Sequence, residues 1–217
     1  MVLKQLPADV ENCYPDYSIY AITDTAYGYL TRGCPRGCRF CIVAEKEGKQ
    51  SKKVANLENF WRGQKNIKLL DPNLLACSDW EELMQQLIDS KACVDFTQGL
   101  DIRLMTAEKA DMIRQCKVKT LHFAWDNPED EPTFENLKEY RKAFSLPDDK
   151  CKVYVLTNFN STHEQDLERV YRLRDVGYDP FVMVYEKWNA PKETKRLQRW
   201  CNNKTIFRAE PDFEKYH

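Results

Sequence analysis

Short apolar runs and amphipathic helical segments alternate along most of this 217-residue chain, and this alternation constrains the fold more than any other feature. A strand that is repeatedly followed by a helix favours parallel strands, because the helix carries the chain back along the sheet. Six such units predict an α/β fold of the partial (β/α)6 TIM-like barrel type with parallel strands. A complete barrel has eight units and typically about 250 residues. A flat doubly wound sheet is the alternative, and the strand patterns discriminate weakly between the two.

The sequence predicts six strands and six helices. The predicted strands are Tyr27–Arg32, Asn66–Leu70, Ala92–Thr97, Leu121–Trp125, Lys152–Thr157 and Pro180–Tyr185. The predicted helices are Leu57–Arg62, Ser78–Ile88, Ala107–Gln115, Thr133–Phe144, Thr162–Val176 and Ala190–Trp200. This pattern divides the chain into an N-terminal extension packing on the core (1–26), a (β/α)6 core (27–189) and a C-terminal helix and tail (190–217).

The charge balance and the cysteine usage narrow the class of protein. Lysine and arginine number 33 against 34 aspartates and glutamates, giving a net charge of -1. A chain with this balance has no overall attraction to nucleic acid or to an anionic membrane. The sequence shows no secretory h-region and no run of the length that crosses a bilayer, so we expect a cytoplasmic protein without membrane contact. Nine cysteines, an odd number, are dispersed apart from one triplet, which is typical of a reducing compartment and one metal site.

The triplet is Cys34, Cys38 and Cys41, with the spacing C-x3-C-x2-C. Three thiolates so close in sequence can converge on one soft metal centre, and no fourth Cys or His follows at short range. A closed structural zinc site takes four protein ligands. An iron–sulfur cluster held by three cysteines would keep one iron open to a cofactor or substrate. The spacing therefore favours a cluster with an open iron over a structural zinc site.

Polar residues follow almost every predicted strand. In parallel α/β folds the carboxyl ends of the strands carry the chemistry. Taken singly, each of these residues is more often a turn residue than a ligand. Together they predict a site at the edge of the sheet that the cysteines also occupy. The residues are Asp71 and Asn73, Gln98, Asp101 and Arg103, then Asp126, Asn158 and the segment from Tyr185 to Lys187.

The segment Thr31-Arg-Gly-Cys-Pro-Arg-Gly-Cys-Arg-Phe-Cys41, after a first strand and before β/α repeats, resembles the radical S-adenosylmethionine (SAM) superfamily. It is most similar to members with an N-terminal cobalamin-binding-type domain, which this chain is expected to lack. The resemblance covers roughly residues 27–186. It implies that Cys34, Cys38 and Cys41 hold three irons of a [4Fe-4S] cluster and that the amine and carboxylate of SAM chelate the fourth. It also implies reductive cleavage of SAM to a 5′-deoxyadenosyl radical, which abstracts hydrogen from an unidentified substrate.

The resemblance assigns expected roles to the polar strand ends. Asp71 and Asn73 are expected near the SAM amine, although the family often has Gly-Gly-Glu where this chain has Asp-Pro-Asn. Arg103, or Lys187 instead, is expected near the carboxylate. The ribose and adenine contacts are expected from Asp126, with Gln98 or Asp101 nearby, and from Phe40, Asn158 and the backbone around Val184. Arg36 and Arg39 would tune the cluster or meet an electron donor such as flavodoxin or ferredoxin.

The substrate is open at this stage. A protein or peptide and a nucleic acid are both compatible with the sequence, and the near-neutral charge counts slightly against nucleic acid. The alternative function is a non-catalytic zinc or iron–sulfur binding module that interacts with RNA or protein. A simple electron carrier is the third hypothesis, and the long β/α scaffold makes it the weakest.

Overall fold

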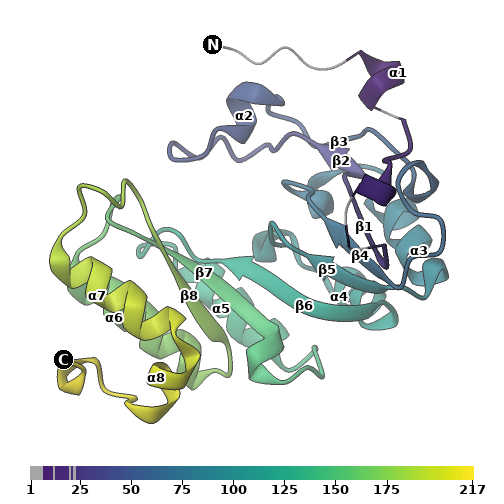
Figure 1. Ribbon diagram of the computed structural model, residues 1–217. Coiled ribbons are helices and arrows are strands. Elements are labelled where there is room, and N and C mark those ends of the chain that lie inside the picture. Colours follow the sequence, from purple (N-terminus) through teal and green to yellow (C-terminus); the bar gives the residue numbers. More distant parts are fainter. Residues whose placement is uncertain (1–6, 12, 20, 22) are drawn as a thin grey trace. The chain divides into compact units, whose positions relative to one another are not determined.

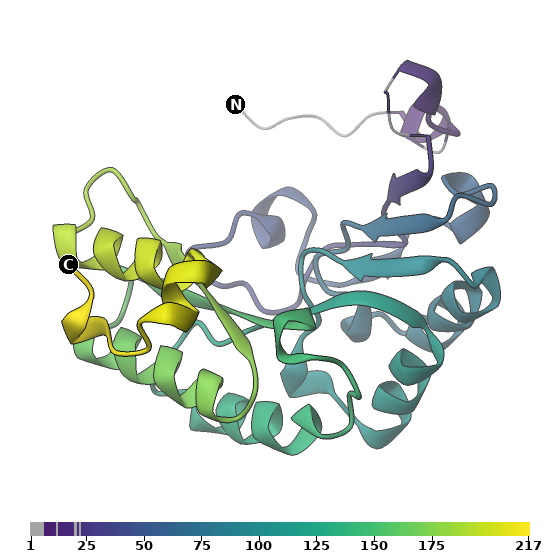
Figure 2. The ribbon, with the colours of Figure 1, turned by 60° about the horizontal axis from the view of Figure 1, so that its bottom comes forward.

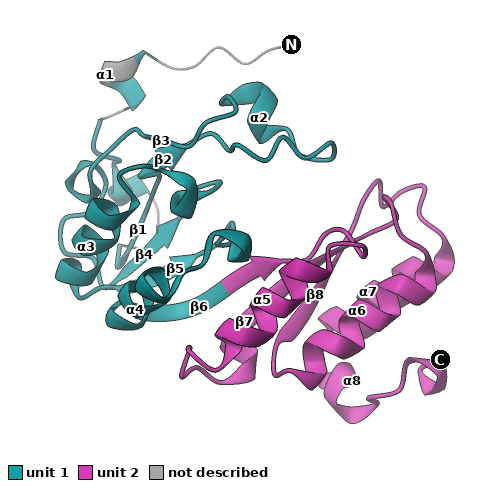
Figure 3. Ribbon diagram, turned by 180° about the vertical axis from the view of Figure 1, so that it is seen from behind, with its two compact units in different colours: residues 1–121 teal, residues 122–217 magenta. Residues whose placement is uncertain are grey.

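A computed structural model describes residues 7–11, 13–19, 21 and 23–217. The chain forms two compact units, residues 1–121 and 122–217, which Figure 3 shows in separate colours. The division falls inside one strand, β6 (Lys117–Ala124).

The six strands of the main sheet have the order β1-β4-β5-β6-β7-β8 (Figure 1). The pairs β1–β4, β4–β5, β5–β6 and β7–β8 are parallel. Parallel strands in this order, with helices between them, confirm the predicted α/β class of a partial (β/α)6 barrel. The other five strands of this sheet are β1 (Thr25–Gly28), β4 (Asn66–Leu69), β5 (Cys93–Phe96), β7 (Cys151–Thr157) and β8 (Asp179–Val184).

The prediction for the first strand was wrong in its bounds. The predicted run Tyr27–Arg32 is divided, because β1 ends at Gly28 and Thr31–Arg32 forms a separate strand, β2. A Cβ atom on Gly28 would lie 2.3 Å from the ring of Phe60, so the backbone passes too close to this ring for any larger residue. Beyond that point β2 pairs antiparallel with β3 (Lys52–Lys53), outside the main sheet.

The long helices lie close to their predicted positions. The segment Leu57–Arg62 is the exception: its helix is a single 3₁₀ turn, Leu57–Asn59. Two short helices, α2 (Val43–Lys46) and α8 (Lys204–Ala209), and a turn of helix, α1 (Ala8–Glu11), were not predicted. The predicted helices are α3 (Trp80–Ser90), α4 (Ala107–Gln115), α5 (Glu131–Arg141), α6 (His163–Asp175) and α7 (Lys192–Asn202).

Each unit has an apolar core between its strands and helices. In the first unit α3 and α4 pack against each other, and Ile67, Leu83 and Val94 are fully buried. In the second unit α6 and α7 contact each other and β8, while α8 and the chain end follow α7 (Figure 2). Its core gathers around Trp200, which contacts the rings of Phe207 and Phe213. No helix among the described residues has the length and apolarity of a membrane span.

Candidate functional site

The loop that carries the three cysteines is anchored at its start by Asp71. This residue follows β4, and its carboxylate accepts hydrogen bonds from the backbone N–H of Thr31 at 2.6 Å and from the Thr31 hydroxyl at 2.7 Å. The N–H of Leu30 donates to the same carboxylate at 3.1 Å. Asp71 is only 5% exposed. It therefore fixes the strand β2 from which the cysteine loop departs.

The turn into the loop is formed by Gly33. Its φ of 85° is a left-handed conformation that glycine adopts without strain, and a Cβ there would lie 2.3 Å from the carbonyl oxygen of Gln50. The N–H of Gly33 donates to Oε2 of Glu47 at 3.0 Å, and the N–H of Cys34 donates to the carbonyl of Gly48 at 3.1 Å. The first cysteine is thus held by backbone contacts to the segment between α2 and β3.

A polar network lies directly beside Cys34. The Asn73 amide Nδ2 is 3.6 Å from the Sγ of Cys34 and donates to Oδ2 of Asp101 at 3.2 Å. The guanidinium groups of Arg36 and Arg103 bind the same Asp101 carboxylate, with Nε–oxygen distances of 2.6 Å and 2.7 Å. Residues from the cysteine loop, from the end of β4 and from the segment after β5 therefore meet at one place in the first unit.

The electrostatics of this network keep Asp101 ionised. Burial alone would raise the pKa of Asp101, whose side chain is 5% exposed. The hydrogen bonds and charges of Arg103 and Arg36 outweigh that effect and hold the pKa below its ordinary value. Asp101 is therefore a carboxylate at neutral pH. It ties the middle of the cysteine loop, through Arg36, to the 3₁₀ turn Ile102–Leu104.

One acceptor in the network has no partner. The Oδ1 atom of Asn73 is buried and receives no hydrogen bond, although the residue is only 3% exposed. A buried polar atom without a partner costs free energy, typically about 1–3 kcal/mol, and its presence in a native fold calls for an explanation. A ligand with an N–H donor beside Cys34 would satisfy this oxygen.

The cysteines differ in exposure. Cys34 and Cys38 are half-buried, Cys41 is exposed, and no cysteine in the described ranges takes part in a disulfide. Over the same residues, no three His, Cys, Asp or Glu side chains are gathered closely enough to hold one metal ion. The three thiols therefore do not meet at a single point in this structure. Their chemistry still fits an iron–sulfur cluster, because three accessible thiols lie on one anchored loop beside the unpartnered Asn73 oxygen.

The remaining predicted residues of the first unit have different positions. The carboxylate of Asp71 is buried against Leu30 and Thr31. Burial raises its pKa to about 6, against the opposing effect of these hydrogen bonds. In this structure Asp71 anchors the backbone, and its expected contact with the SAM amine stays a prediction. Phe40 is half-buried in the cysteine loop, and Gln98 is exposed after β5.

In the second unit the predicted residues lie at or just after the carboxyl ends of β6, β7 and β8. Asp126 and Val184 are half-buried. Asn158 has a φ of 61° and donates from Nδ2 to the carbonyl of Tyr185 at 2.8 Å, so its amide joins the ends of β7 and β8. Glu186, just after β8, has a φ of 43°. Two left-handed residues other than glycine at neighbouring strand ends store conformational strain, which is common near functional sites.

Sequence reasoning did not identify two residues that organise these strand ends. Glu47 holds Gly33, and no local pattern marks it. Arg169 of α6 is 2% exposed and donates to the carbonyls of Trp125 and Leu156 at 2.6 Å and 2.8 Å. It also pairs with the buried Asp166 at 2.6 Å. A charged pair at i and i+3 on the helix face that carries Val170 and Leu173 is a signal that could have revealed it.

The comparisons with known proteins show the fold. No protein-family profile matches the chain, and no curated protein sequence matches it. Solved structures of SuiB from Streptococcus suis match with a TM-score of 0.59. The structure of SuiB bound to the precursor peptide SuiA has 14% identity and matches over 85% of this chain and 46% of its own. SuiB bound to S-adenosylmethionine has 12% identity and matches over 85% of this chain and 47% of its own. A further structure of SuiB has 14% identity and matches over 92% of this chain and 48% of its own. The chain therefore spans about half the length of SuiB and shares its fold.

Proposed function

We propose that this chain is a radical SAM enzyme, in which a [4Fe-4S] cluster reductively cleaves SAM to a 5′-deoxyadenosyl radical that abstracts hydrogen from a substrate. The observation that carries the proposal is the unpartnered Asn73 oxygen beside Cys34, the first cysteine of a C-x3-C-x2-C loop. The fold shared with SuiB, which has been solved with SAM, supports the same conclusion. The finer likeness to cobalamin-type members rests on the loop sequence alone.

In this proposal Cys34, Cys38 and Cys41 hold the cluster, which supplies one electron when it is bound and reduced. Asn73 orients the cofactor by accepting a hydrogen bond from its amine at Oδ1. Asp101 holds Asn73 and Arg36 in place and keeps Arg103 next to the carboxylate of the cofactor.

The contacts proposed for the rest of the cofactor come from the sequence alone. Phe40 would lie near the adenine, and Gln98 would contact the ribose. Asp126, Asn158 and the backbone at Val184 are further proposed contacts, and Lys187 is the alternative partner of the carboxylate. An electron donor such as flavodoxin or ferredoxin would reduce the cluster, with Arg36 and Arg39 on its approach side.

The substrate proposal starts from the two classes left open by the sequence. SuiB has been solved with a precursor peptide, which supports a protein or peptide substrate. A nucleic acid is the other class. With either class of substrate, the proposed enzyme acts in the cytoplasm.

The test is anaerobic reconstitution with iron and sulfide, followed by assay with SAM and dithionite. We expect iron and sulfide in the protein and 5′-deoxyadenosine in the products. The single changes Cys34→Ala, Cys38→Ala and Cys41→Ala should each abolish the product. Cys13→Ala is the matched control, because Cys13 is exposed like Cys41 but lies outside the loop.

Two results would contradict the proposal. A cysteine variant of the loop that still forms 5′-deoxyadenosine would exclude the assigned ligands. One zinc per chain without sulfide and without cleavage of SAM would favour the non-catalytic binding module.

A further inference from the structure

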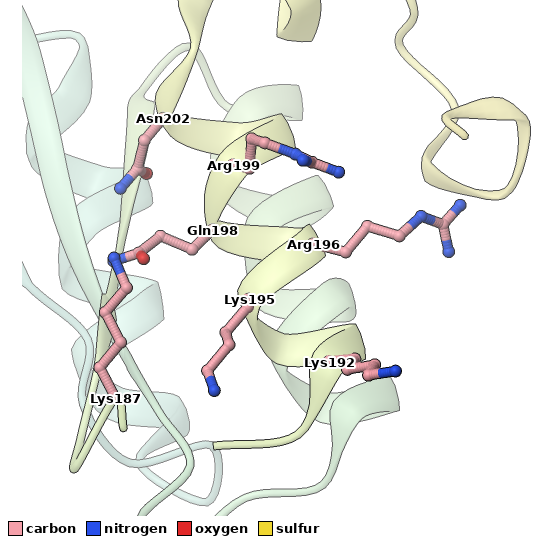
Figure 4. A pocket seen from close by; sticks show the side chains of 7 residues that line it. All are labelled: Lys187, Lys192, Lys195, Arg196, Gln198, Arg199 and Asn202. Atoms are coloured by element: carbon pink, nitrogen blue, oxygen red, sulfur yellow. The ribbon is translucent and has the colours of Figure 1, made fainter. Parts of the chain in front are cut away.

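A basic cavity in the second unit shares only Lys187 with the contacts proposed for the cofactor. It has a volume of ≈ 670 Å³ and is lined by the side chains that Figure 4 labels: Lys187, Lys192, Lys195, Arg196, Gln198, Arg199 and Asn202. Five of these seven residues are cationic and none is acidic. The lining therefore creates a positive potential, which attracts ligands with several negative charges.

Four of the five cations share one face of α7. Thr194, Leu197 and Trp200 bury the inner face of this helix in the core of the second unit. Lys192, Lys195, Arg196 and Arg199 follow the spacing i, i+3, i+4 and i+7, so they line the opposite face over about 10 Å of helix length. Figure 4 shows them along α7, with Lys187 joining from the segment after β8.

The positive charge of the cavity is not compensated by carboxylates. Across the described ranges, none of its five cations forms an ion pair. The acidic residues between Tyr185 and Asn202 are Glu186 and Glu193, and Glu193 lies 3.6 Å from His163 instead. Arg196 donates to the backbone carbonyl oxygens of Phe213 and Tyr216, which carry no net charge. The net charge of -1 for the whole chain thus conceals a local excess of positive charge.

An exposed tryptophan is hydrogen-bonded through its backbone to a residue that lines this cavity. Trp188 is 94% exposed and follows Lys187 directly, and the Nζ of Lys195 donates to its carbonyl at 3.1 Å. An indole ring that the folded chain does not cover is a stacking platform for a planar group. Proteins that bind single-stranded nucleic acid combine two features. Cations contact the phosphate backbone of the strand, and aromatic rings stack on its bases.

We infer that this cavity binds single-stranded nucleic acid, with the phosphates along α7 and a base on Trp188. An acidic peptide is the competing ligand. Bidentate recognition of carboxylates is a property of arginine, whereas three of the five cations here are lysines, which bind phosphate as point charges. Arg196 already uses its Nε and one terminal nitrogen in bonds to carbonyls. These features favour phosphodiesters. The inference rests on the four cations of α7 and on Trp188, none of which is a proposed SAM contact.

The test is a fluorescence anisotropy titration of the full chain with a labelled oligothymidylate of about 15 nucleotides, within the range of known single-strand sites. The logarithm of the association constant should fall linearly with the logarithm of salt concentration between about 50 and about 200 mM. The double change Lys187→Ala and Lys192→Ala should reduce the slope by about 1.4, or about 0.7 for each lost phosphate contact.

Two further variants make the result specific. Lys117→Ala with Lys119→Ala is the matched control, because these two lysines are also exposed and form no ion pair among the described residues. It should leave the affinity and the slope unchanged. Trp188→Ala should weaken binding roughly tenfold without changing the salt slope, because stacking releases no counterions.

Equal affinities for the cavity variant and the control would overturn the inference. So would competition by polyglutamate as effective as competition by unlabelled oligothymidylate, which would assign the cavity to acidic peptides. Trp188 is at the surface, so its replacement tests the stacking role even if the double lysine variant folds poorly.

Discussion

The carboxylate of Asp71 holds Thr31 at two points, the backbone N–H at 2.6 Å and the hydroxyl at 2.7 Å. These two residues are 40 positions apart in the sequence, and their contact fixes the strand that leads into the cysteine loop. The contact is almost inaccessible to water, and burial raises the pKa of Asp71 to about 6. The anchor of the loop is therefore itself a titrating group.

Asp71→Asn should change how stability depends on pH. The pKa of Asp71 is about 6 in the folded chain and near its ordinary value of 3.8 in the unfolded chain, so the folded state binds the extra proton between these values. The wild-type free energy of unfolding should therefore fall as the pH rises through this window, by about 3 kcal/mol relative to Asp71→Asn. Above about pH 7 the difference between the two proteins should become constant.

Urea unfolding of both proteins at a series of pH values measures this difference. The comparison with Asp71→Asn cancels the other titrating groups, which the two proteins share. A difference that does not vary from about pH 4 to about pH 6 would show that Asp71 is ionised throughout.

Gly33→Ala should disrupt the cysteine loop more than its backbone conformation alone requires. Gly33 and Gly63 both have a left-handed φ, 85° and 92°, so alanine costs about 1–2 kcal/mol at either position. At Gly33 the new Cβ would also lie 2.3 Å from the carbonyl oxygen of Gln50, while at Gly63 it would meet nothing within 4 Å. The clash should add about 1–3 kcal/mol and displace Cys34.

Thermal unfolding and iron content after reconstitution test this pair of variants. We expect a lower Tm and less iron for Gly33→Ala than for Gly63→Ala. Equal Tm values and full iron content in both would mean that the segment around Gln50 moves aside at little cost.

The sequence predicts the regular elements well and the contacts of the site poorly, for a physical reason. The strand Asn66–Leu69 and the helix Ala107–Gln115 are visible because local periodicity and capping specify them. The end of β1 at Gly28 depends on the ring of Phe60, which is 32 residues from Gly28. Through Leu30 it also depends on the carboxylate of Asp71, which is 41 residues from Leu30. No local window contains that information.

The same distinction applies to the polar strand ends. Their chain positions identified Asp71, Asn73 and Asp101 together. Their different roles depend on tertiary partners: Asp71 is saturated by Thr31 and Leu30, while Asn73 retains an unpartnered oxygen. The sequence pattern alone gives the two residues the same expected role.

Asn73→Leu should weaken SAM binding by roughly tenfold or more, because a hydrogen bond to a charged group contributes about 1.5–3 kcal/mol. The substitution keeps the size of the side chain and removes both the buried acceptor and the donor to Asp101. Asn66→Leu is the control, since it makes the same change at the start of β4, where Nδ2 has only long contacts of 3.4 Å and 3.5 Å to Asp24.

Isothermal titration of the reconstituted proteins with SAM measures the effect. We expect the affinity of Asn66→Leu to equal that of the wild type. Undiminished affinity in Asn73→Leu would remove Asn73 from the cofactor site and leave its oxygen unexplained.

Arg169→Leu should be among the most destabilising single changes in the second unit. Arg169 and Asp166 are 2% exposed, and the change would leave the Asp166 carboxylate buried without its partner. Removing one member of a buried ion pair typically costs about 3–5 kcal/mol. The carbonyls of Trp125 and Leu156 would also lose a donor.

Combining Arg169→Leu with Asp166→Asn separates these contributions. The double variant should recover part of the loss, because no buried charge remains, and the unrecovered part is the value of the bonds to the two strand-end carbonyls. Arg114→Leu is the surface control: its ion pair with Asp111 is about half exposed and should contribute at most about 1 kcal/mol. Urea unfolding of the four proteins gives the free energies. A double variant no more stable than Arg169→Leu would show that Arg169 acts by binding the ends of β6 and β7 and not by neutralising Asp166.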